Sequence, residues 1–331
     1  STEPTFFALS QRVFRGGTSA NSPFSISTGS PSITKEEYCD QVVFNGLLYV
    51  FAENTVHKLT PGAGAGVWST VSGSSLTTDT SHKLAVMKGT RRLYYTDENN
   101  KVYSMSVAEA FSNTVGADYT FDASAYGADH IAWIECGGNT VYIGCTVIGG
   151  NGFVIAWDGI TANIYDRIYE LDSPASLACV INSNTPVIID CSGKLLALSG
   201  DGTVEFGRLP IASQNYYLAS YGSRAMGSRP IHPNGMKLID GVYYVAVGGD
   251  VTSYINTDYR TPGGVYIFNP LDKSGLKHFI SPSMNISGDD QVDYGIMYPV
   301  YMGAICDGTT TSSSYAQDSG TLLFSAQVID A

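Results

Sequence analysis

Short apolar runs alternate with turns rich in glycine, asparagine and aspartate along most of the chain, and one three-residue apolar segment recurs. The first residues of five copies lie 45, 48, 46 and 55 positions apart, and a weaker sixth copy follows 58 positions later. The copies occupy residues 48–50, 93–95, 141–143, 187–189, 242–244 and 300–302. A repeat of this length predicts an array of similar structural units.

Each triplet belongs to the same local pattern of strands. A second apolar run precedes it, and the two runs are joined by a turn such as Asn45-Gly46 or Asp240-Gly241, which is a strong signal for a β-hairpin. A third apolar run follows every triplet, and a more polar fourth run can be identified in five units. No long amphipathic helix interrupts the pattern, so each unit is expected to be a small antiparallel sheet.

Four short strands repeated six times predict an all-β fold, a β-propeller of six four-stranded blades, because a β-sandwich has no reason to repeat such a unit. The whole chain, 1–331, is expected to form a single propeller domain. The last unit lacks a fourth strand, and residues 6–14 form an unassigned strand-like segment. We expect this N-terminal strand to complete the last blade and close the ring, which would remove exposed sheet edges. The expected blades are 36–72, 82–122, 130–170, 175–209, 235–281 and 290–331 with 6–14.

One blade carries a recognisable motif. Residues 92–102, with the sequence RLYYTDENNKV, resemble a YWTD-type propeller repeat and, more loosely, an NHL repeat. This resemblance implies a propeller fold. The other blades carry Ala52, Cys145 and Cys191 near the position of Asp97. The low lysine content, the many Gly, Ser, Thr and Tyr residues, and the sequence of residues 43–50 are similar to propeller domains of phage tail and nozzle proteins.

Composition narrows the classes of function. The 331 residues carry a formal net charge of −12 and only 15% charged side chains. Nucleic-acid binding is not expected, because phosphate contacts need clustered Lys and Arg. No apolar run is long enough to span a membrane. The six cysteines show no metal-ligand spacing and are interpreted mainly as small buried side chains, although an even count also permits disulfides.

A search for catalytic chemistry gives no strong candidate, so no catalytic residue, metal or cofactor is expected. The chain has no G-x-S-x-G, H-E-x-x-H or phosphate-binding glycine loop. His82 and His130 come just before the first strands of the second and third expected blades. We expect their side chains to be exposed to solvent and not to bind a ligand. The remaining weak candidates are interpreted as loop or turn residues: a partial Asp box at 199–203, arginines Arg224, Arg229 and Arg260, and aspartates Asp289, Asp290, Asp293, Asp307 and Asp318.

Two long loops are the most informative departures from the repeat. They connect the second and third strands of the last two expected blades, at 248–263 and 307–320, and should emerge on the same face. Tyrosine and arginine are enriched at binding hot spots. The expected contact residues are Tyr254, Asn256, Asp258, Tyr259, Arg260 and Tyr315.

The sequence therefore favours a non-catalytic structural or recognition module of a large assembly, such as a phage virion tail. Its partners would be protein subunits or surface glycan, and its location the virion. The alternative is a secreted propeller enzyme of the hydrolase or lactonase type, or a sugar-binding lectin, that uses the axial pocket. Convergent ionisable groups at one mouth of the channel would favour the enzyme.

Overall fold

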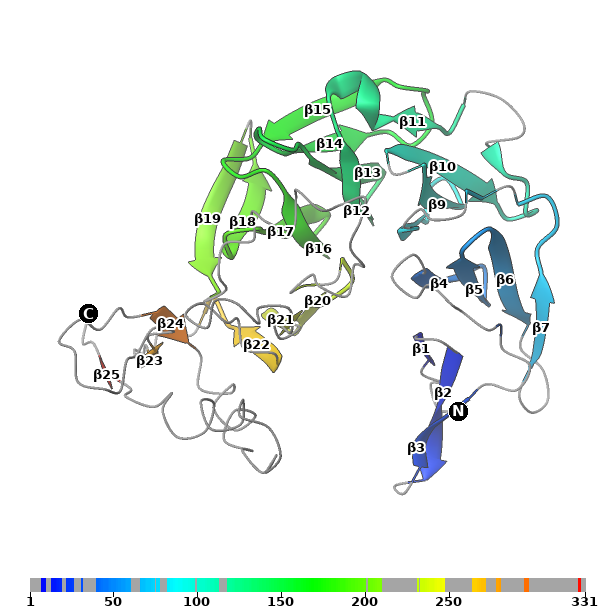
Figure 1. Ribbon diagram of the computed structural model, residues 1–331, viewed down its shortest axis with the longest axis horizontal. Helices are drawn as coiled ribbons and strands as arrows, with labels where there is room; N and C mark the ends of the chain where they lie inside the picture. The colour runs from blue at the N-terminus through cyan, green and yellow to red at the C-terminus, as the bar shows by residue number, and fades with distance from the viewer. Residues whose placement is uncertain are drawn as a thin grey trace. The chain divides into compact units, whose positions relative to one another are not determined.

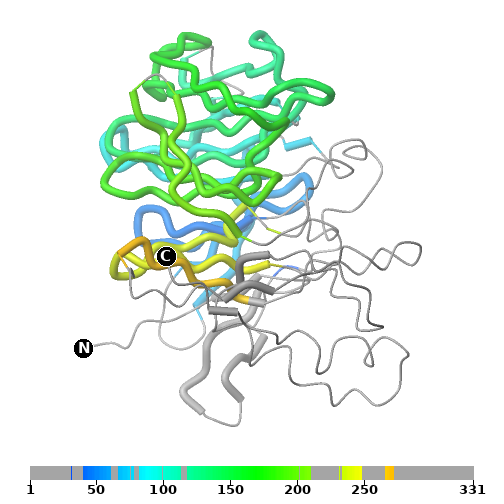
Figure 2. Tube along the Cα trace, turned by 90° about the vertical axis from the view of Figure 1, so that its left-hand side faces the viewer, coloured from blue at the N-terminus to red at the C-terminus, as the bar shows by residue number. Residues whose placement is uncertain are grey.

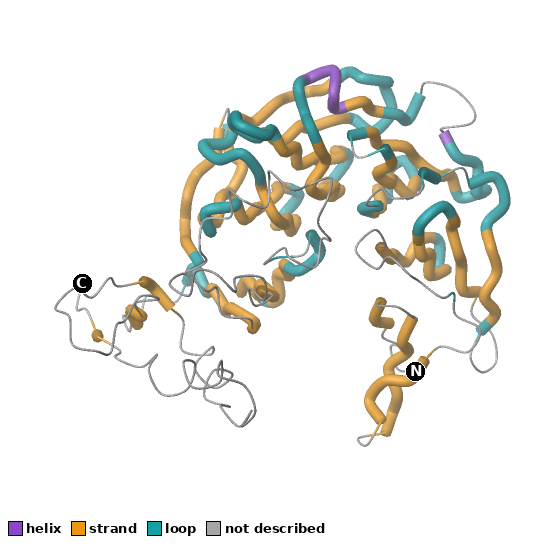
Figure 3. Tube along the Cα trace, viewed as in Figure 1, coloured by secondary structure: helices purple, strands orange, loops and turns teal. Residues whose placement is uncertain are grey.

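The protein was analysed as a computed structural model. It describes residues 31, 40–60, 66–74, 76–77, 82–98, 100–112, 118–200, 202–209, 231, 233–247 and 264–271, and the strand backbones at 7–9, 13–19, 22–26, 278–280, 295–297 and 327–328. Within these residues the secondary structure is almost entirely β (Figure 3). A short 3₁₀ turn, Ala123–Tyr126, follows β11 and begins at Asp122, whose side chain accepts a hydrogen bond from the Ser124 amide.

The strands form five consecutive antiparallel sheets that correspond to the blades of a β-propeller (Figure 1). The first comprises β4 (Asp40–Phe44), β5 (Leu47–Ala52), β6 (Thr55–Thr60) and β7 (Val67–Thr70). The second comprises β8 (Leu84–Met87), β9 (Arg92–Asp97), β10 (Lys101–Ser106) and β11 (Phe121–Asp122). The third comprises β12 (His130–Gly137), β13 (Thr140–Thr146), β14 (Phe153–Trp157) and β15 (Tyr165–Glu170).

The fourth blade comprises β16 (Ser176–Asn182), β17 (Thr185–Asp190), β18 (Lys194–Ser199) and β19 (Gly202–Arg208). The fifth has three described strands, β20 (Met236–Ile239), β21 (Val242–Val247) and β22 (Gly264–Phe268). Strands follow one another in chain order across every blade, so each blade is a meander built from neighbouring segments. Figure 2 traces this back-and-forth path as a tube.

The hairpin turns form where the sequence predicted them. Phe44 pairs with Leu47 across a two-residue turn in which Asn45 and Gly46 both have positive φ, 49° and 77°. Asp240 and Gly241 adopt the same conformation between β20 and β21, with φ of 51° and 81°. Asparagine, aspartate and glycine tolerate this backbone conformation, which is why these dipeptides specify tight hairpins.

Burial follows position in the blade. The second strands of blades one, two and four are almost fully buried, whereas all residues of the outer strands β7, β15 and β19 are exposed or half-buried. The polar outer strand expected from the sequence is therefore confirmed in these blades. Alternation of polar residues on an outer strand is expected where one face of the strand is solvated.

The chain divides into two compact units, each with its own apolar core. One unit contains Ser1–Cys145 and Ile155–Ile168, and the other Thr146–Val154 and Tyr169–Ala331. A core cluster of the first unit joins the first two blades and includes Tyr49, Phe51, Leu93, Tyr95 and Met105. The core of the second unit joins the fourth and fifth blades through residues that include Ile189, Leu195, Tyr243, Val245 and Phe268.

The expected number of blades was wrong. Among the described residues the strands form five blades and not six. In the region of the expected sixth blade, β24 (Gly295–Met297) and β25 (Gln327–Val328) both pair with β23 (His278–Ile280), which had been expected to belong to blade five. The sequence offers a physical reason, since the hairpin signals that define the repeat are weak after β22. Segments 300–302 and 321–324 lie outside the described residues.

The N-terminal segment was expected to form one strand that completes the last blade, and that closure stays a prediction because residues 321–324 lie outside the described residues. The segment contains two strands, β1 (Phe7–Leu9) and β2 (Val13–Ser19), which pair with each other, and β3 (Ser22–Ile26) pairs with β2. Among the described strands neither β1 nor β2 pairs with β25. Pairing between neighbouring segments closes a much shorter loop than pairing between the chain ends, and therefore costs less conformational entropy.

Candidate functional site

The contact residues expected on the two long loops all lie outside the described residues. This holds for Tyr254, Asn256, Asp258, Tyr259, Arg260 and Tyr315, and for the loop candidates Arg224, Arg229, Asp289, Asp290, Asp293, Asp307 and Asp318. The partial Asp box coincides with the hairpin between β18 and β19, where Ser199 pairs with Gly202. The polar chemistry that the structure does describe lies at the blade turns and at the contacts between neighbouring blades.

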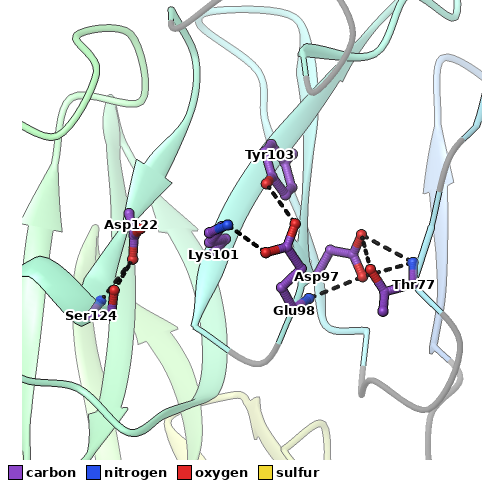
Figure 4. Close-up of polar contacts among 7 residues, drawn as sticks. All are labelled: Thr77, Asp97, Glu98, Lys101, Tyr103, Asp122 and Ser124. Carbon is purple, nitrogen blue, oxygen red and sulfur yellow. Dashed lines mark hydrogen bonds and ion pairs between the residues drawn. The ribbon is translucent and has the colours of Figure 1, made fainter.

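The most strongly built polar site surrounds Asp97, the last residue of β9 (Figure 4). Its carboxylate is 2% exposed and accepts hydrogen bonds from the Thr77 amide at 3.1 and 3.2 Å and from the Glu98 amide at 3.0 Å. The Thr77 hydroxyl donates to the same group at 3.4 Å. Asp97 therefore fixes both its own turn and the segment that leads from β7 to β8.

A second, exposed cluster lies on the next residues of this turn (Figure 4). The Glu98 carboxylate receives hydrogen bonds from the Lys101 ammonium and from the Tyr103 hydroxyl, the latter at 3.3 Å. Burial, together with Glu98, raises the pKa of Tyr103 to about 12. Asp122 accepts from the Ser124 amide at 3.0 Å and from its hydroxyl. These contacts order two turns at the surface of the second blade.

An aspartate at the position of Asp97 also occurs in blade four. Comparison of the apolar triplets in the sequence did not reveal it. Counted from the first residue after each hairpin turn, the sixth residue is Ala52 in blade one, Asp97 in blade two and Asp190 in blade four. The sequence had placed Cys191 there. The apolar triplet begins at the second residue of β5 and β9 but at the third residue of β17, because Pro186 stands second there, so counting from the triplet shifts the position by one residue.

Asp190 orders its own turn as Asp97 does, but its partners all lie within four residues of it. It is 1% exposed and accepts hydrogen bonds from the Ser192 amide at 2.9 Å, the Ser192 hydroxyl at 2.8 Å and the Lys194 amide at 2.8 Å. A buried carboxylate surrounded by backbone donors stabilises a turn, because these amides would otherwise lose their hydrogen bonds to water.

Two buried polar side chains join the first blade to the second. Asp40, at the start of β4, accepts from the Gln41 amide at 2.7 Å and from the Leu84 amide of β8 at 3.0 Å. The His82 ring lies within 2.9 Å of the Thr96 carbonyl oxygen and 2.7 Å of the Glu53 carbonyl oxygen. His82 is only 2% exposed, so the expectation that it is solvated was wrong. His130 is half-buried.

A half-buried ion pair forms another contact between these blades. The Lys58 ammonium lies 2.6 and 2.7 Å from the two Glu109 carboxylate oxygens, and the Tyr49 hydroxyl donates to one of them at 2.9 Å. Burial raises the pKa of Tyr49, and the hydrogen bond and the charge of Glu109 raise it further. Glu109 has φ of 61°, a conformation uncommon for residues other than glycine, asparagine and aspartate. No local sequence pattern predicts this contact, because Glu109 lies 60 residues from Tyr49 and 51 residues from Lys58.

The second blade contacts the third through aromatic rings. The Tyr94 hydroxyl donates to the Gly159 carbonyl oxygen at 2.8 Å, and its ring meets that of Trp157 edge-on at 5.7 Å. Burial raises the pKa of Tyr94 to about 12. Gly159 has φ of 73°, and a Cβ atom there would lie 2.6 Å from the tyrosine hydroxyl. Glycine is therefore required both by the backbone conformation and by this close approach.

The described cysteines do not form a cluster of metal ligands. Cys145, Cys179 and Cys191 are buried, as expected for small apolar side chains, and Cys136 is half-buried. Burial raises the pKa of Cys145. Cys39 and Cys306 lie outside the described residues. Within the part of the chain that the structure describes, no group of three or more His, Cys, Asp or Glu side chains could hold a metal ion. No described helix is long and apolar enough to cross a membrane.

Comparison with known proteins shows that this fold is similar to those of solved structures. No family model and no curated protein sequence matches the chain. The structure is similar to the extracellular domain of a one-component system from B. thetaiotaomicron, with a TM-score of 0.52 and 13% identity over 89% of this chain and 36% of that one. A solved nidogen/laminin complex matches with a TM-score of 0.42 and 10% identity, over 73% of this chain and 84% of the other. At such identities the likeness concerns the fold alone.

His57 on β6 predicts a pH dependence of stability. Burial lowers the pKa of His57 below its ordinary value of 6.5, and the charge of Glu53 only partly offsets this. As the pH falls below 6.5, His57 becomes protonated in the unfolded chain while it is still neutral in the folded protein. The free energy of unfolding therefore decreases. Urea unfolding at about pH 7.5 and about pH 5.5 should show a smaller acid-induced loss for His57→Gln than for the wild type. Equal losses in the two proteins would contradict this assignment.

Proposed function

We propose that this chain is a non-catalytic structural or recognition module of a large assembly and that it contacts protein or glycan through its two long tyrosine-rich loops. A phage virion tail is the proposed setting, supported by the compositional likeness to tail and nozzle propellers. The fold comparison supports the propeller scaffold and leaves the partner open.

One structural observation carries the non-catalytic part of the proposal. The three buried carboxylates among the described residues, Asp40, Asp97 and Asp190, all accept hydrogen bonds from backbone amides. The buried ring of His82 lies between two backbone carbonyl oxygens. Catalytic groups must reach a substrate, whereas these groups contact the backbone of their own or a neighbouring blade. Such a scaffold is well suited to presenting loops.

The test combines the native assembly with a loop variant. Light scattering and electron microscopy of natively isolated material should show the protein in a ring, tube or virion. A variant with Tyr254→Ser, Tyr259→Ser and Arg260→Ala should keep its circular dichroism spectrum and lose incorporation into that assembly, or binding on a glycan array. Tyr165→Ser, which removes a 40% exposed tyrosine from β15, serves as the matched control.

Two results would contradict the proposal. One is that the loop variant assembles and binds as well as the control. The other is a monodisperse particle that contains one or two chains and turns over a hydrolase or lactonase substrate. The second result would favour an enzyme that uses the axial pocket.

A further inference from the structure

Strand β7 is the outer edge of the first blade among the described strands (Figure 1). Its first residue, Val67, is 68% exposed, and Ser69 and Thr70 are also exposed. An edge strand presents backbone donors and acceptors on its outer side, and natural proteins commonly protect such edges with charged side chains. The charge along β7 therefore decides whether this edge is protected or available for pairing.

The sequence of β7 and of the segments on either side of it lacks charged residues. Residues 59–78, which contain the strand, carry no Asp, Glu, Lys or Arg, although the chain as a whole has a net charge of −12. The two other long outer strands differ: β15 carries Asp166, Arg167 and Glu170, and β19 carries Glu205 and Arg208. Two copies of this acidic chain repel each other. The repulsion is weakest between surfaces that carry no charged side chains, such as β7.

The register of β7 against β6 shows how a second strand would fit. The Val71 amide donates to the Val56 carbonyl oxygen at 2.8 Å, and Thr70 lies opposite His57. In an antiparallel ladder the residues that exchange hydrogen bonds with one neighbour alternate with residues directed to the other side. Ser69 therefore belongs to the inward-bonded set, and the backbone of Thr70 is directed away from β6.

We propose that a second copy of this chain pairs antiparallel with β7 about a two-fold axis at Ser69. In this register Ser69 lies opposite Ser69 of the second copy, and Thr70 lies opposite Trp68. The contact is isologous, as expected for a symmetric dimer. No charged side chain faces another, whereas two-fold axes at Asp166 or Arg167 in β15, or at Glu205 in β19, would place like charges directly opposite.

The same geometry makes the pairing testable with one cysteine. Directly opposite residues of a pair that is not hydrogen-bonded have Cα atoms about 4.5 Å apart, which is within the range that a disulfide can bridge. The Ser69→Cys variant should therefore form a covalent dimer under mild oxidation. Val204→Cys, at a 54% exposed position of the outer strand β19, is the matched control, and the wild type controls for the native cysteines.

A single short strand is a small interface, so we expect reversible dimers at roughly micromolar or higher concentration, as for other small contacts. Light scattering should approach twice the chain mass of 35.3 kDa as concentration rises. Ser69→Lys, which places two ammonium groups opposite each other, should weaken dimerisation by about two- to fivefold. Circular dichroism should show that both variants keep the wild-type fold.

Three results would overturn this proposal: a wild-type chain that stays monomeric at high concentration, equal cross-linking of Val204→Cys and Ser69→Cys, and self-association unchanged in Ser69→Lys. The inference is independent of the proposed function, because it involves neither long loop. Loss of dimerisation in Ser69→Lys with normal binding by the loops would support β7 pairing alone, and the reverse result would support the loop function alone.

Discussion

Gly144→Ala is expected to destabilise the protein by about 3 kcal/mol, at the upper end of the usual cost of overpacking a core. Gly144 lies on β13, beside the Trp133 ring of the adjacent strand β12. A Cβ atom at this position would lie 2.2 Å from Cε2 of Trp133 and 2.3 Å from its Nε1. Trp133 is only 1% exposed, so the ring is enclosed by the protein and cannot swing out into solvent. Urea unfolding should give a clearly lower midpoint for the variant.

A matched glycine separates this steric effect from a general effect of alanine. Gly202, at the start of β19, has no atom within 4 Å of the position that a Cβ would occupy. Gly202→Ala should therefore change the free energy of unfolding by less than about 1 kcal/mol. A Gly144→Ala protein as stable as Gly202→Ala would show that Trp133 does not pack against Gly144.

Asp97→Ala is expected to cost about 2–3 kcal/mol of unfolding free energy, because hydrogen bonds to a charged group are worth about twice as much as neutral ones. The substitution leaves the amides of Thr77 and Glu98 without their carboxylate acceptor. Asp97→Asn keeps one acceptor oxygen and should recover part of the loss. Denaturant unfolding of the three proteins gives this order directly.

An exposed aspartate in the same blade supplies the control. Asp118→Ala should change stability by no more than about 0.5 kcal/mol, as is usual for surface substitutions. If Asp97→Ala behaved like Asp118→Ala, the Asp97 carboxylate would not hold the connection between the first two blades. Asp190→Ala extends the comparison, and the same loss is expected there because Asp190 is equally buried.

Part of the candidate site could be predicted from the sequence. The YWTD-type motif contains Asp97. The structure shows why an aspartate suits that position, because its carboxylate accepts hydrogen bonds from two backbone amides at the end of a buried strand. Its counterpart Asp190 was missed because Pro186 displaces the apolar triplet by one residue within β17, so the repeat counted from the triplets is out of register there. Asp40, His82 and Glu109 were not predictable as contacts between blades, because their partners are distant in sequence and no local pattern encodes the pairing.

The sequence by itself determined the local structure of this protein. Turns such as Asn45-Gly46 and apolar strand patterns act over a few residues, so hairpins, the four-strand repeat and the polar outer strands follow from them. The tertiary structure alone decided the number of blades, the pairing of β1 with β2 and the role of each buried polar residue. These depend on which distant strands pack together, and that choice is set by the summed burial and hydrogen bonding of whole blades, which no short segment contains.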